Sequence, residues 1–222
     1  METQYVTSKH LWWQDAVGNL NSPYADYLLF DDAAHRQPAT MVFDLRFLKG
    51  YDGQIINVTT VNLKSPKVLD YNIALFSYFL DPNKDGKFDD GVDGFRLDHA
   101  MDHLDGKPTL TNLFAEFWKP LIAAVKKVNP AVKIVAEQAD WADYGFAYFE
   151  KATVDRMFGF GLQKAILSFD KQQIINNAEV ILRQTPAGKE QVIFIENHDI
   201  DRFASLDFAL EKQKAAAALM LL

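Results

Sequence analysis

The sequence of 222 residues contains no cysteine. Disulfides, thiolate metal sites and cysteine nucleophiles are therefore excluded. The cellular compartment stays open, since chains without cysteine occur on either side of a membrane. The sequence also has no apolar run of the roughly 20 residues that a membrane span needs. Its first residues show neither the basic region nor the apolar stretch of a targeting segment.

Positive charge is scarce relative to negative charge. The 23 Lys and Arg residues face 30 Asp and Glu residues, which gives a formal net charge of −7. Nucleic acids and anionic membranes are bound through an excess of Lys and Arg, so the sequence predicts neither as a partner. Hydrophobic residues make up 49% of the chain, enough for a sizeable core, and this excludes general disorder.

Residue patterns divide the chain into two parts. Residues 1–64 show no sustained helical period and are predicted to be irregular. Beyond them, helical stripes alternate with short apolar runs, which predicts a parallel sheet with helical crossovers and an α/β fold of about four strands. The predicted helices cover about 65–79, 111–128 and 170–183, and the predicted strands cover 92–98, 132–137, 156–160 and 192–196.

Three acidic residues stand where predicted strands end: Asp98, Glu137 and Asp199. Because the carboxyl ends of parallel strands carry the active site in α/β folds, we expect these carboxyls to converge. Arg96 faces the same side of its strand as Asp98 and would favour the ionised form that a nucleophile requires. Partial burial of Glu137 would favour the protonated form that a general acid requires. The alternative is that each acid is a solvated loop residue.

A second acidic pattern begins at Asp81. Oxygen-bearing residues alternate along the segment and a glycine stands sixth, the arrangement that wraps a hard cation in calcium loops. Val92 occupies the place of the glutamate that completes an EF-hand, and a strand follows, so an EF-hand is excluded. The alternative is a solvated acidic turn. The expected Ca²⁺ ligands are Asp81, Asn83, Asp85, the Lys87 carbonyl and Asp89.

Two further residues lie close to the strand-end acids. Trp141 follows Glu137 by four residues, and its ring is either a platform for a sugar or part of the loop packing. His99 directly follows Asp98 on the other side of the strand direction and is interpreted as structural.

Three segments resemble motifs of the α-amylase superfamily, glycoside hydrolase family 13. Residues 91–98 (Gly-Val-Asp-Gly-Phe-Arg-Leu-Asp) are similar to the fourth-strand motif, 134–137 (Ile-Val-Ala-Glu) to the fifth-strand motif, and 194–199 (Phe-Ile-Glu-Asn-His-Asp) to the seventh-strand motif. Residues 61–68 resemble the segment that returns from the family's domain B into the barrel. The order of the segments also matches that of the family.

The resemblance implies a partial (β/α)8 barrel comprising about strands four to seven. Residues 65–222 would form this partial catalytic barrel, and residues 1–64 would be a remnant of domain B. A complete barrel takes roughly 250 residues, so the missing barrel half is expected from the rest of a longer chain. The apolar end at 215–222 is consistent with this expectation.

The resemblance also implies roles for the site residues. Asp98 would be the nucleophile that forms a covalent glycosyl-enzyme, Glu137 the general acid/base, and Asp199 a ligand of sugar hydroxyls in the transition state. Arg96 and His198 would line the same subsite. The implied activity is retaining hydrolysis of α-glucans or malto-oligosaccharides.

The sequence departs from the family pattern after the nucleophile. The family usually has Lys-His where this chain has Met101 and Asp102, and His103 one residue later is the candidate replacement for that sugar contact. The third-strand motif is absent. This absence leaves open a non-catalytic carbohydrate- or calcium-binding fragment. A transglycosylase or isomerase of the same family also stays open, because these motifs do not distinguish water from a sugar as the acceptor.

Overall fold

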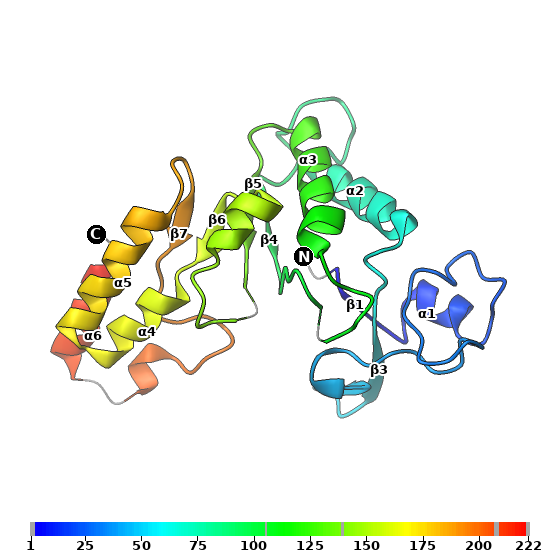
Figure 1. The fold of residues 1–222 in the computed structure, drawn as a ribbon, viewed down its shortest axis with the longest axis horizontal. Helices are drawn as coiled ribbons and strands as arrows, with labels where there is room; N and C mark the ends of the chain where they lie inside the picture. The colour runs from blue at the N-terminus through cyan, green and yellow to red at the C-terminus, as the bar shows by residue number, and fades with distance from the viewer. Residues whose placement is uncertain (1–2, 105, 139, 207–208, 221–222) are drawn as a thin grey trace. The chain divides into compact units, whose positions relative to one another are not determined.

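The computed structural model describes residues 3–104, 106–138, 140–206 and 209–220, and Figure 1 follows the chain from blue to red. Its contacts divide it into two compact units. The first comprises Met1–Asp93 with Met101–Val132, and the second comprises Gly94–Ala100 with Lys133–Leu222. The predicted domain boundary between residues 64 and 65 stays a prediction, since compactness alone does not define a domain.

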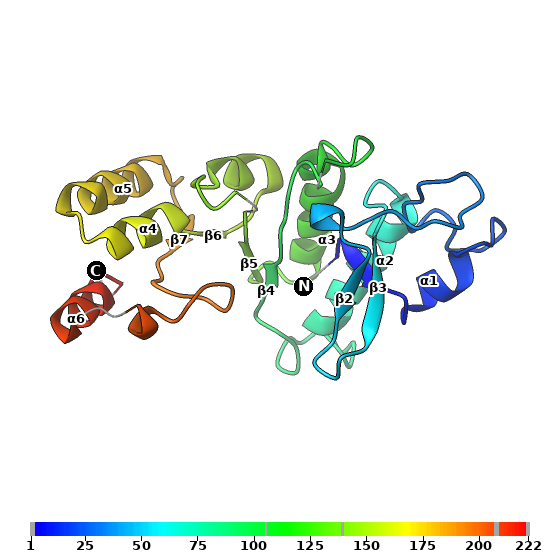
Figure 2. The ribbon, with the colours of Figure 1, turned by 90° about the horizontal axis from the view of Figure 1, so that it is seen from below.

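The first unit contains a small antiparallel sheet that the sequence did not predict. Its strands are β1 (Tyr5–Thr7), β2 (Phe47–Lys49) and β3 (Ile55–Thr60), in the order β1-β3-β2 (Figure 2). The prediction of an irregular segment is therefore wrong here. All three residues of β2 are exposed and two of the strands have three residues, so no alternation of apolar and polar residues marks them. A short helix, α1 (Leu11–Ala16), and a 3₁₀ turn at Val42–Asp44 complete this part.

The first predicted helix is confirmed as α2 (Pro66–Leu80). Proline fits its first position because no helical acceptor exists there for a backbone N–H. Its buried residues recur at a spacing of four, which is the stripe that a helix buries on one side. They are Val68, Asn72, Phe76 and Leu80.

The second predicted helix is present but is divided in two. A π-helical segment (Phe114–Trp118) leads directly into α3 (Lys119–Val128). Pro120 has no N–H to donate to the carbonyl of Glu116, so the turn before it widens. The distortion before Pro120 therefore takes the form of a π segment.

The second unit is built on a parallel sheet of order β4-β5-β6-β7. The strands are β4 (Gly94–Leu97), β5 (Lys133–Ala136), β6 (Arg156–Phe158) and β7 (Glu190–Val192). They confirm the four predicted strands, but β7 lies earlier than predicted and ends at Val192. Its neighbour β6 ends opposite, at Phe158, so residues 193–196 have no partner in the ladder.

Gly94 allows β4 to approach β5 closely. A Cβ atom at this position would lie 2.4 Å from the Lys133 carbonyl oxygen, which no side chain tolerates. Any other residue would push apart the two strands whose ends carry Asp98 and Glu137.

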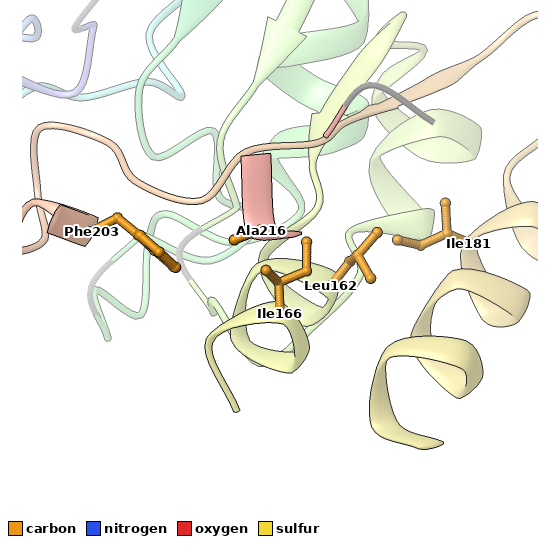
Figure 3. Packing of buried hydrophobic residues seen from close by; sticks show 5 residues of the cluster. All are labelled: Leu162, Ile166, Ile181, Phe203 and Ala216. Atoms are coloured by element: carbon orange, nitrogen blue, oxygen red, sulfur yellow. The ribbon is translucent and has the colours of Figure 1, made fainter. Parts of the chain in front are cut away.

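Helices α4 (Phe160–Ser168), α5 (Lys171–Gln184) and α6 (Leu210–Leu219) accompany this sheet, with a π segment at Tyr148–Ala152 and a 3₁₀ turn at Phe203–Ser205. Helix α5 was predicted, and its Asp170 cap accepts a hydrogen bond from the Gln173 N–H at 3.0 Å. The apolar core between these helices is shown in Figure 3 and consists of Leu162, Ile166, Ile181, Phe203 and Ala216. Among the described residues, no helix combines the length and the apolar character of a membrane span.

Candidate active site

The ends of β4 and β5 place two carboxyl groups side by side. Leu97 is paired with Ala136, and Asp98 and Glu137 are the next residue of each chain segment. The Glu137 N–H donates to the Leu97 carbonyl at 3.0 Å, so the pairing of the two segments continues past the strands. The structure thus brings together two of the three acids that the sequence singled out.

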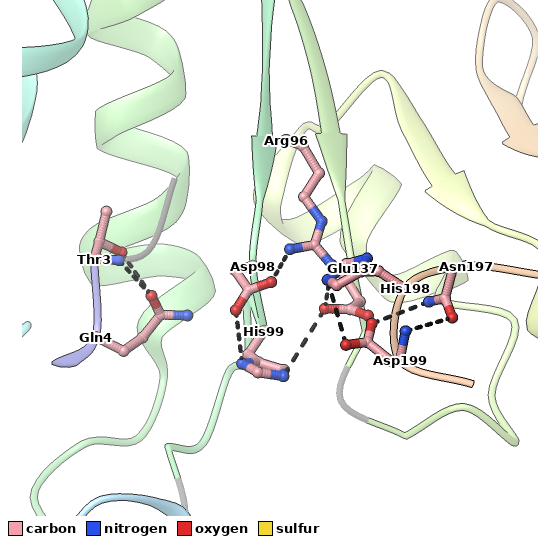
Figure 4. Close-up of polar contacts among 9 residues, drawn as sticks. All are labelled: Thr3, Gln4, Arg96, Asp98, His99, Glu137, Asn197, His198 and Asp199. Carbon is pink, nitrogen blue, oxygen red and sulfur yellow. Dashed lines mark hydrogen bonds and ion pairs between the residues drawn. The ribbon is translucent and has the colours of Figure 1, made fainter. Parts of the chain in front are cut away.

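Arg96 lies between these carboxyls (Figure 4). One guanidinium nitrogen pairs with Asp98 Oδ1, and Nη2 lies 2.8 Å from Glu137 Oε2. The Arg96 guanidinium also lies 5.9 Å from the centre of the Phe158 ring. The Glu137 side chain is only 2% exposed, so Arg96 supplies the charge compensation that a buried carboxylate needs.

His99 contacts the same two carboxyls, contrary to the prediction that it lies on the other side of the strand direction. Its Nδ1 lies 3.1 Å from Asp98 Oδ2, and its Nε2 lies 3.9 Å from Glu137 Oε2. The strand alternation that placed it on the opposite side ends at Leu97, and His99 has a positive φ of 39°. No signal in the sequence marks this change of backbone direction.

One ligand atom from each of Asp98, His99 and Glu137 lies within 4.8 Å of the other two. Such a group has the composition of a small metal site. The guanidinium of Arg96 already contacts both carboxylates, however, and a cation would have to displace it. The arrangement therefore favours a pair of reacting carboxyls over a metal centre.

Asp199 lies in a local hydrogen-bond network beyond β7. Its Oδ2 accepts from Asn197 Nδ2 at 3.0 Å, and its N–H donates to Asn197 Oδ1 at 3.1 Å. His198 Nε2 lies 3.3 Å from Asp199 Oδ1, and the His198 side chain is 71% exposed. Figure 4 draws these residues together with Glu137, but Asp199 is outside the group whose ligand atoms lie within 4.8 Å. The convergence of the third acid stays a prediction.

The loop after Glu137 is held by residues that the sequence analysis did not identify. The buried Gln138 amide donates from Nε2 to the Asp143 carbonyl at 3.0 Å and to the Phe158 carbonyl at 2.8 Å. Gln191 Nε2 donates to the Tyr144 carbonyl at 2.7 Å. Both glutamines therefore tie the loop to the sheet. Only burial and hydrogen bonds distinguish them from ordinary polar residues.

Trp141 belongs to this loop and packs on an aromatic neighbour. Its ring is stacked on Phe160, with centroids 4.9 Å apart and planes inclined by 7°. Phe160 in turn meets Phe194 edge to face at 5.1 Å. One face of Trp141 is thus used in packing, and a contact between its other face and a sugar stays a prediction.

His103 belongs to the other compact unit. Its Nε2 lies 3.5 Å from Asp102 Oδ2, and its side chain is 70% exposed. Asp102 itself accepts a hydrogen bond from the Phe114 N–H at 2.7 Å and so caps the helical segment that begins there. The sugar contact proposed for His103 stays a prediction.

The segment from Asp81 to Asp89 forms the turn that a cation loop requires. Gly86 has a positive φ of 78°, and its N–H donates to Asp81 Oδ2 at 3.0 Å. The Asp85 N–H donates to Asn83 Oδ1 at 2.9 Å, so these oxygens point into the loop. These contacts are compatible with both a cation loop and a solvated acidic turn. In the described part of the chain, however, the loop acids do not form a group of three clustered ligand atoms. Calcium stays a prediction.

Comparison with known proteins finds curated relatives that are named as an alpha-amylase and a trehalose synthase/amylase. It is 26% identical over 204 residues to alpha-amylase 3 of Dictyoglomus thermophilum, covering 88% of this chain and 38% of the relative. It is 23% identical over 218 residues to the trehalose synthase/amylase TreS of Mycolicibacterium smegmatis, covering 88% of this chain and 35% of the relative. No family model matches the chain.

Solved structures agree in fold. The alpha-amylase from H. orenii has a TM-score of 0.74 at 23% identity, covering 99% of this chain and 46% of that structure. A cyclomaltodextrinase has a TM-score of 0.70 at 17% identity, covering 99% and 35%. At these identities the likenesses show that the chain shares the fold of part of each structure.

These likenesses support the resemblance to glycoside hydrolase family 13 that the sequence motifs indicated. The parallel sheet agrees with part of a (β/α)8 barrel, the fold that the resemblance implied. The chain spans less than two fifths of the length of either curated relative. The activity of the full-length relatives therefore enters only as a proposal for this chain.

Proposed function

We propose that this chain carries the catalytic carboxyls of a retaining α-glycoside hydrolase that acts on α-glucans or malto-oligosaccharides. One observation carries the proposal: Asp98 and Glu137 leave adjacent parallel strands and are joined by the Arg96 guanidinium. The curated relatives named as amylases support the substrate class.

The separation of the carboxyls supports retention of configuration. An oxygen of Asp98 and an oxygen of Glu137 lie within 4.8 Å of each other. Retaining enzymes hold their two carboxyl groups about 5–5.5 Å apart, whereas inverting enzymes need about 6.5–9.5 Å to admit a water molecule between them.

The proposed reaction has two steps. The Glu137 carboxylate, which pairs with Arg96 in the free protein, takes up a proton as the substrate binds. In the first step, an Asp98 oxygen forms a bond to the anomeric carbon, the glycosidic bond breaks, and Glu137 gives this proton to the departing oxygen. In the second, the Glu137 carboxylate takes a proton from water, the water oxygen bonds to the anomeric carbon, and the ester bond to Asp98 breaks. Both carboxyls return to their starting states.

Other residues are assigned supporting roles in this proposal. Arg96 holds the negative charge of Asp98 between turnovers, and Asp199 with His198 would bind sugar hydroxyls. Trp141 would present its free face to a neighbouring sugar unit.

A second candidate is transfer to a sugar instead of water. It is favoured by the similarity to TreS, which is named as both a synthase and an amylase. The two reactions share the covalent intermediate and differ only in the acceptor of the second step. A third candidate function is binding of carbohydrate without catalysis.

A product assay separates these candidates. The chain is incubated with starch and with maltose, reducing ends are counted, and the sugars are separated by chromatography. Hydrolysis raises the number of reducing ends, whereas isomerisation or transfer changes the products without raising it. No change in either substrate, together with measurable binding, would contradict catalysis.

We further propose that the loop Asp81–Asp89 binds Ca²⁺. The ligands would be the side chains of Asp81, Asn83, Asp85 and Asp89 with the Lys87 carbonyl, an oxygen set that suits this cation. Binding only to the folded state should raise the free energy of unfolding by about 2.7 kcal/mol at a hundredfold excess over Kd.

Melting curves with Ca²⁺ and with chelator test the calcium proposal. We expect a higher Tm in Ca²⁺ for the wild-type chain and a much smaller difference for Asp85→Ala. Asp52→Ala, in another exposed turn, is the matched control and should keep the wild-type response. Equal melting of the wild type under both conditions would show that the loop is an ordinary acidic turn.

A further inference from the structure

His99 reaches the carboxyl pair because the chain bulges directly after β4. The Glu137 N–H donates to the Leu97 carbonyl at 3.0 Å, and the Glu137 carbonyl accepts from the Ala100 N–H at 3.1 Å. In a regular parallel pair, this second donor would be residue 99, two positions after Leu97. One extra residue therefore lies between the two hydrogen bonds, which is the definition of a β-bulge.

The bulge places His99 in an unfavourable backbone conformation. Its φ of 39° lies in the left-handed region, which residues with a Cβ rarely adopt. Backbone strain of this kind persists where the surrounding structure requires it, most often at active sites. Bulges next to active sites likewise redirect a side chain. The strained backbone at His99 therefore turns the imidazole ring toward the two carboxyls.

The redirected ring completes the contacts of Asp98. Arg96 pairs with Oδ1 of this carboxylate, and His99 Nδ1 lies 3.1 Å from Oδ2. A carboxylate held at both oxygens cannot rotate freely about its Cβ–Cγ bond. The other ring nitrogen lies 3.9 Å from Glu137 Oε2, so the imidazole lies close to both carboxyls.

We propose that His99 is a positioning residue for the reaction. It sets the plane of the Asp98 carboxylate and its spacing from Glu137, and thereby the direction from which Asp98 attacks the anomeric carbon. The inference rests on the proposed function. Loss of a near-attack geometry lowers the rate of the chemical step and leaves substrate binding largely unchanged.

Two substitutions separate the ring from the backbone. Glycine adopts positive φ without cost and has no side chain, so His99→Gly removes the contact and relieves the strain. Asparagine also tolerates this conformation and carries an N–H donor at about the position of imidazole Nδ1, so His99→Asn should keep the contact to Asp98.

His35 also has a positive φ, of 55°, but stacks on Phe30 in the other compact unit. His35→Asn is therefore the matched control.

The kinetic test uses 4-nitrophenyl α-maltoside, whose leaving group needs little help from an acid. We expect His99→Gly to lower kcat about 100-fold with little change in KM. His99→Asn should keep more than a tenth of the wild-type kcat, and His35→Asn should match the wild type. Wild-type turnover by His99→Gly, with its folding checked by a melting curve, would overturn the proposal.

A second measurement does not depend on turnover. The ring ¹⁵N signals of the histidines are recorded in the wild type, in Asp98→Asn and in Asp199→Asn. We expect the His99 ring to respond to Asp98→Asn and to be unaffected by Asp199→Asn, and an unresponsive ring would overturn the inference. If the ring responds but the wild type cleaves no α-glucoside, the proposed function fails while the contact between His99 and Asp98 stands.

Discussion

Replacing Glu137 by glutamine is expected to lower kcat on maltose by about 10²–10⁴-fold, the usual contribution of a general acid. The amide keeps the size of the side chain but has no acidic proton for the departing sugar oxygen. With 4-nitrophenyl α-maltoside the loss in the first step should be far smaller, because nitrophenolate leaves without protonation. Because kcat/KM reports only the first step, comparing this ratio for the two substrates separates proton donation from the role of Glu137 as base in the second step.

Asp98→Asn supplies the contrast for this experiment. A neutral amide cannot form the glycosyl ester, so both substrates should lose activity, by on the order of 10⁴-fold or more. Glu179→Gln, an exposed residue paired with Arg183 on α5, is the control and should be unchanged. If Glu137→Gln affected both substrates equally, the acid role would belong to another residue.

Replacing Arg96 by methionine is expected to lower the free energy of unfolding by about 3 kcal/mol. Breaking a buried pair costs about 3–5 kcal/mol because the remaining charge is left uncompensated, and the lower value applies because the Arg96 side chain is 31% exposed. Urea unfolding measures the change directly.

The double variant Arg96→Met/Glu137→Gln tests the reason for this loss. Removing the charge of Glu137 as well should restore part of the stability, since the more buried of the two carboxylates that Arg96 pairs with is then neutral and only the more exposed Asp98 is left without its partner. A double variant as unstable as the sum of the single variants would show that Arg96 acts through packing, for example through its contact with Phe158. A single variant within about 0.5 kcal/mol of the wild type would contradict the expected loss.

Much of the sheet and its neighbourhood could be predicted from local signals. The proline at the start of α2 and the apolar helical period after it predicted a helix over about 65–79, within one residue of each observed end, although two of the buried positions, Asn72 and Leu80, were not in the predicted stripe. Alternating helices and apolar runs gave a parallel sheet, and parallel strands necessarily bring the residues after β4 and β5 together. The adjacency of Asp98 and Glu137 follows from this topology.

The features that the sequence did not predict depend on contacts between distant segments. His99 faces the carboxyls because Ala100, and not His99, donates to the Glu137 carbonyl, and no local pattern encodes such a bulge. Strand β7 ends at Val192 because its neighbour ends, although the apolar run continues. The exposed strand β2 has no apolar period to detect.

The close approach at Gly94 determines which substitutions this segment tolerates during evolution. Only glycine avoids a clash with the Lys133 carbonyl at this position, and this requirement is independent of catalysis. Packing makes no comparable demand at Asp98, and a buried ion pair such as that of Arg96 and Glu137 is a poor source of stability by itself. A lineage freed from catalysis would therefore keep the glycine and lose the charges. The charges, and not the glycine, are the residues whose presence indicates selection for chemistry.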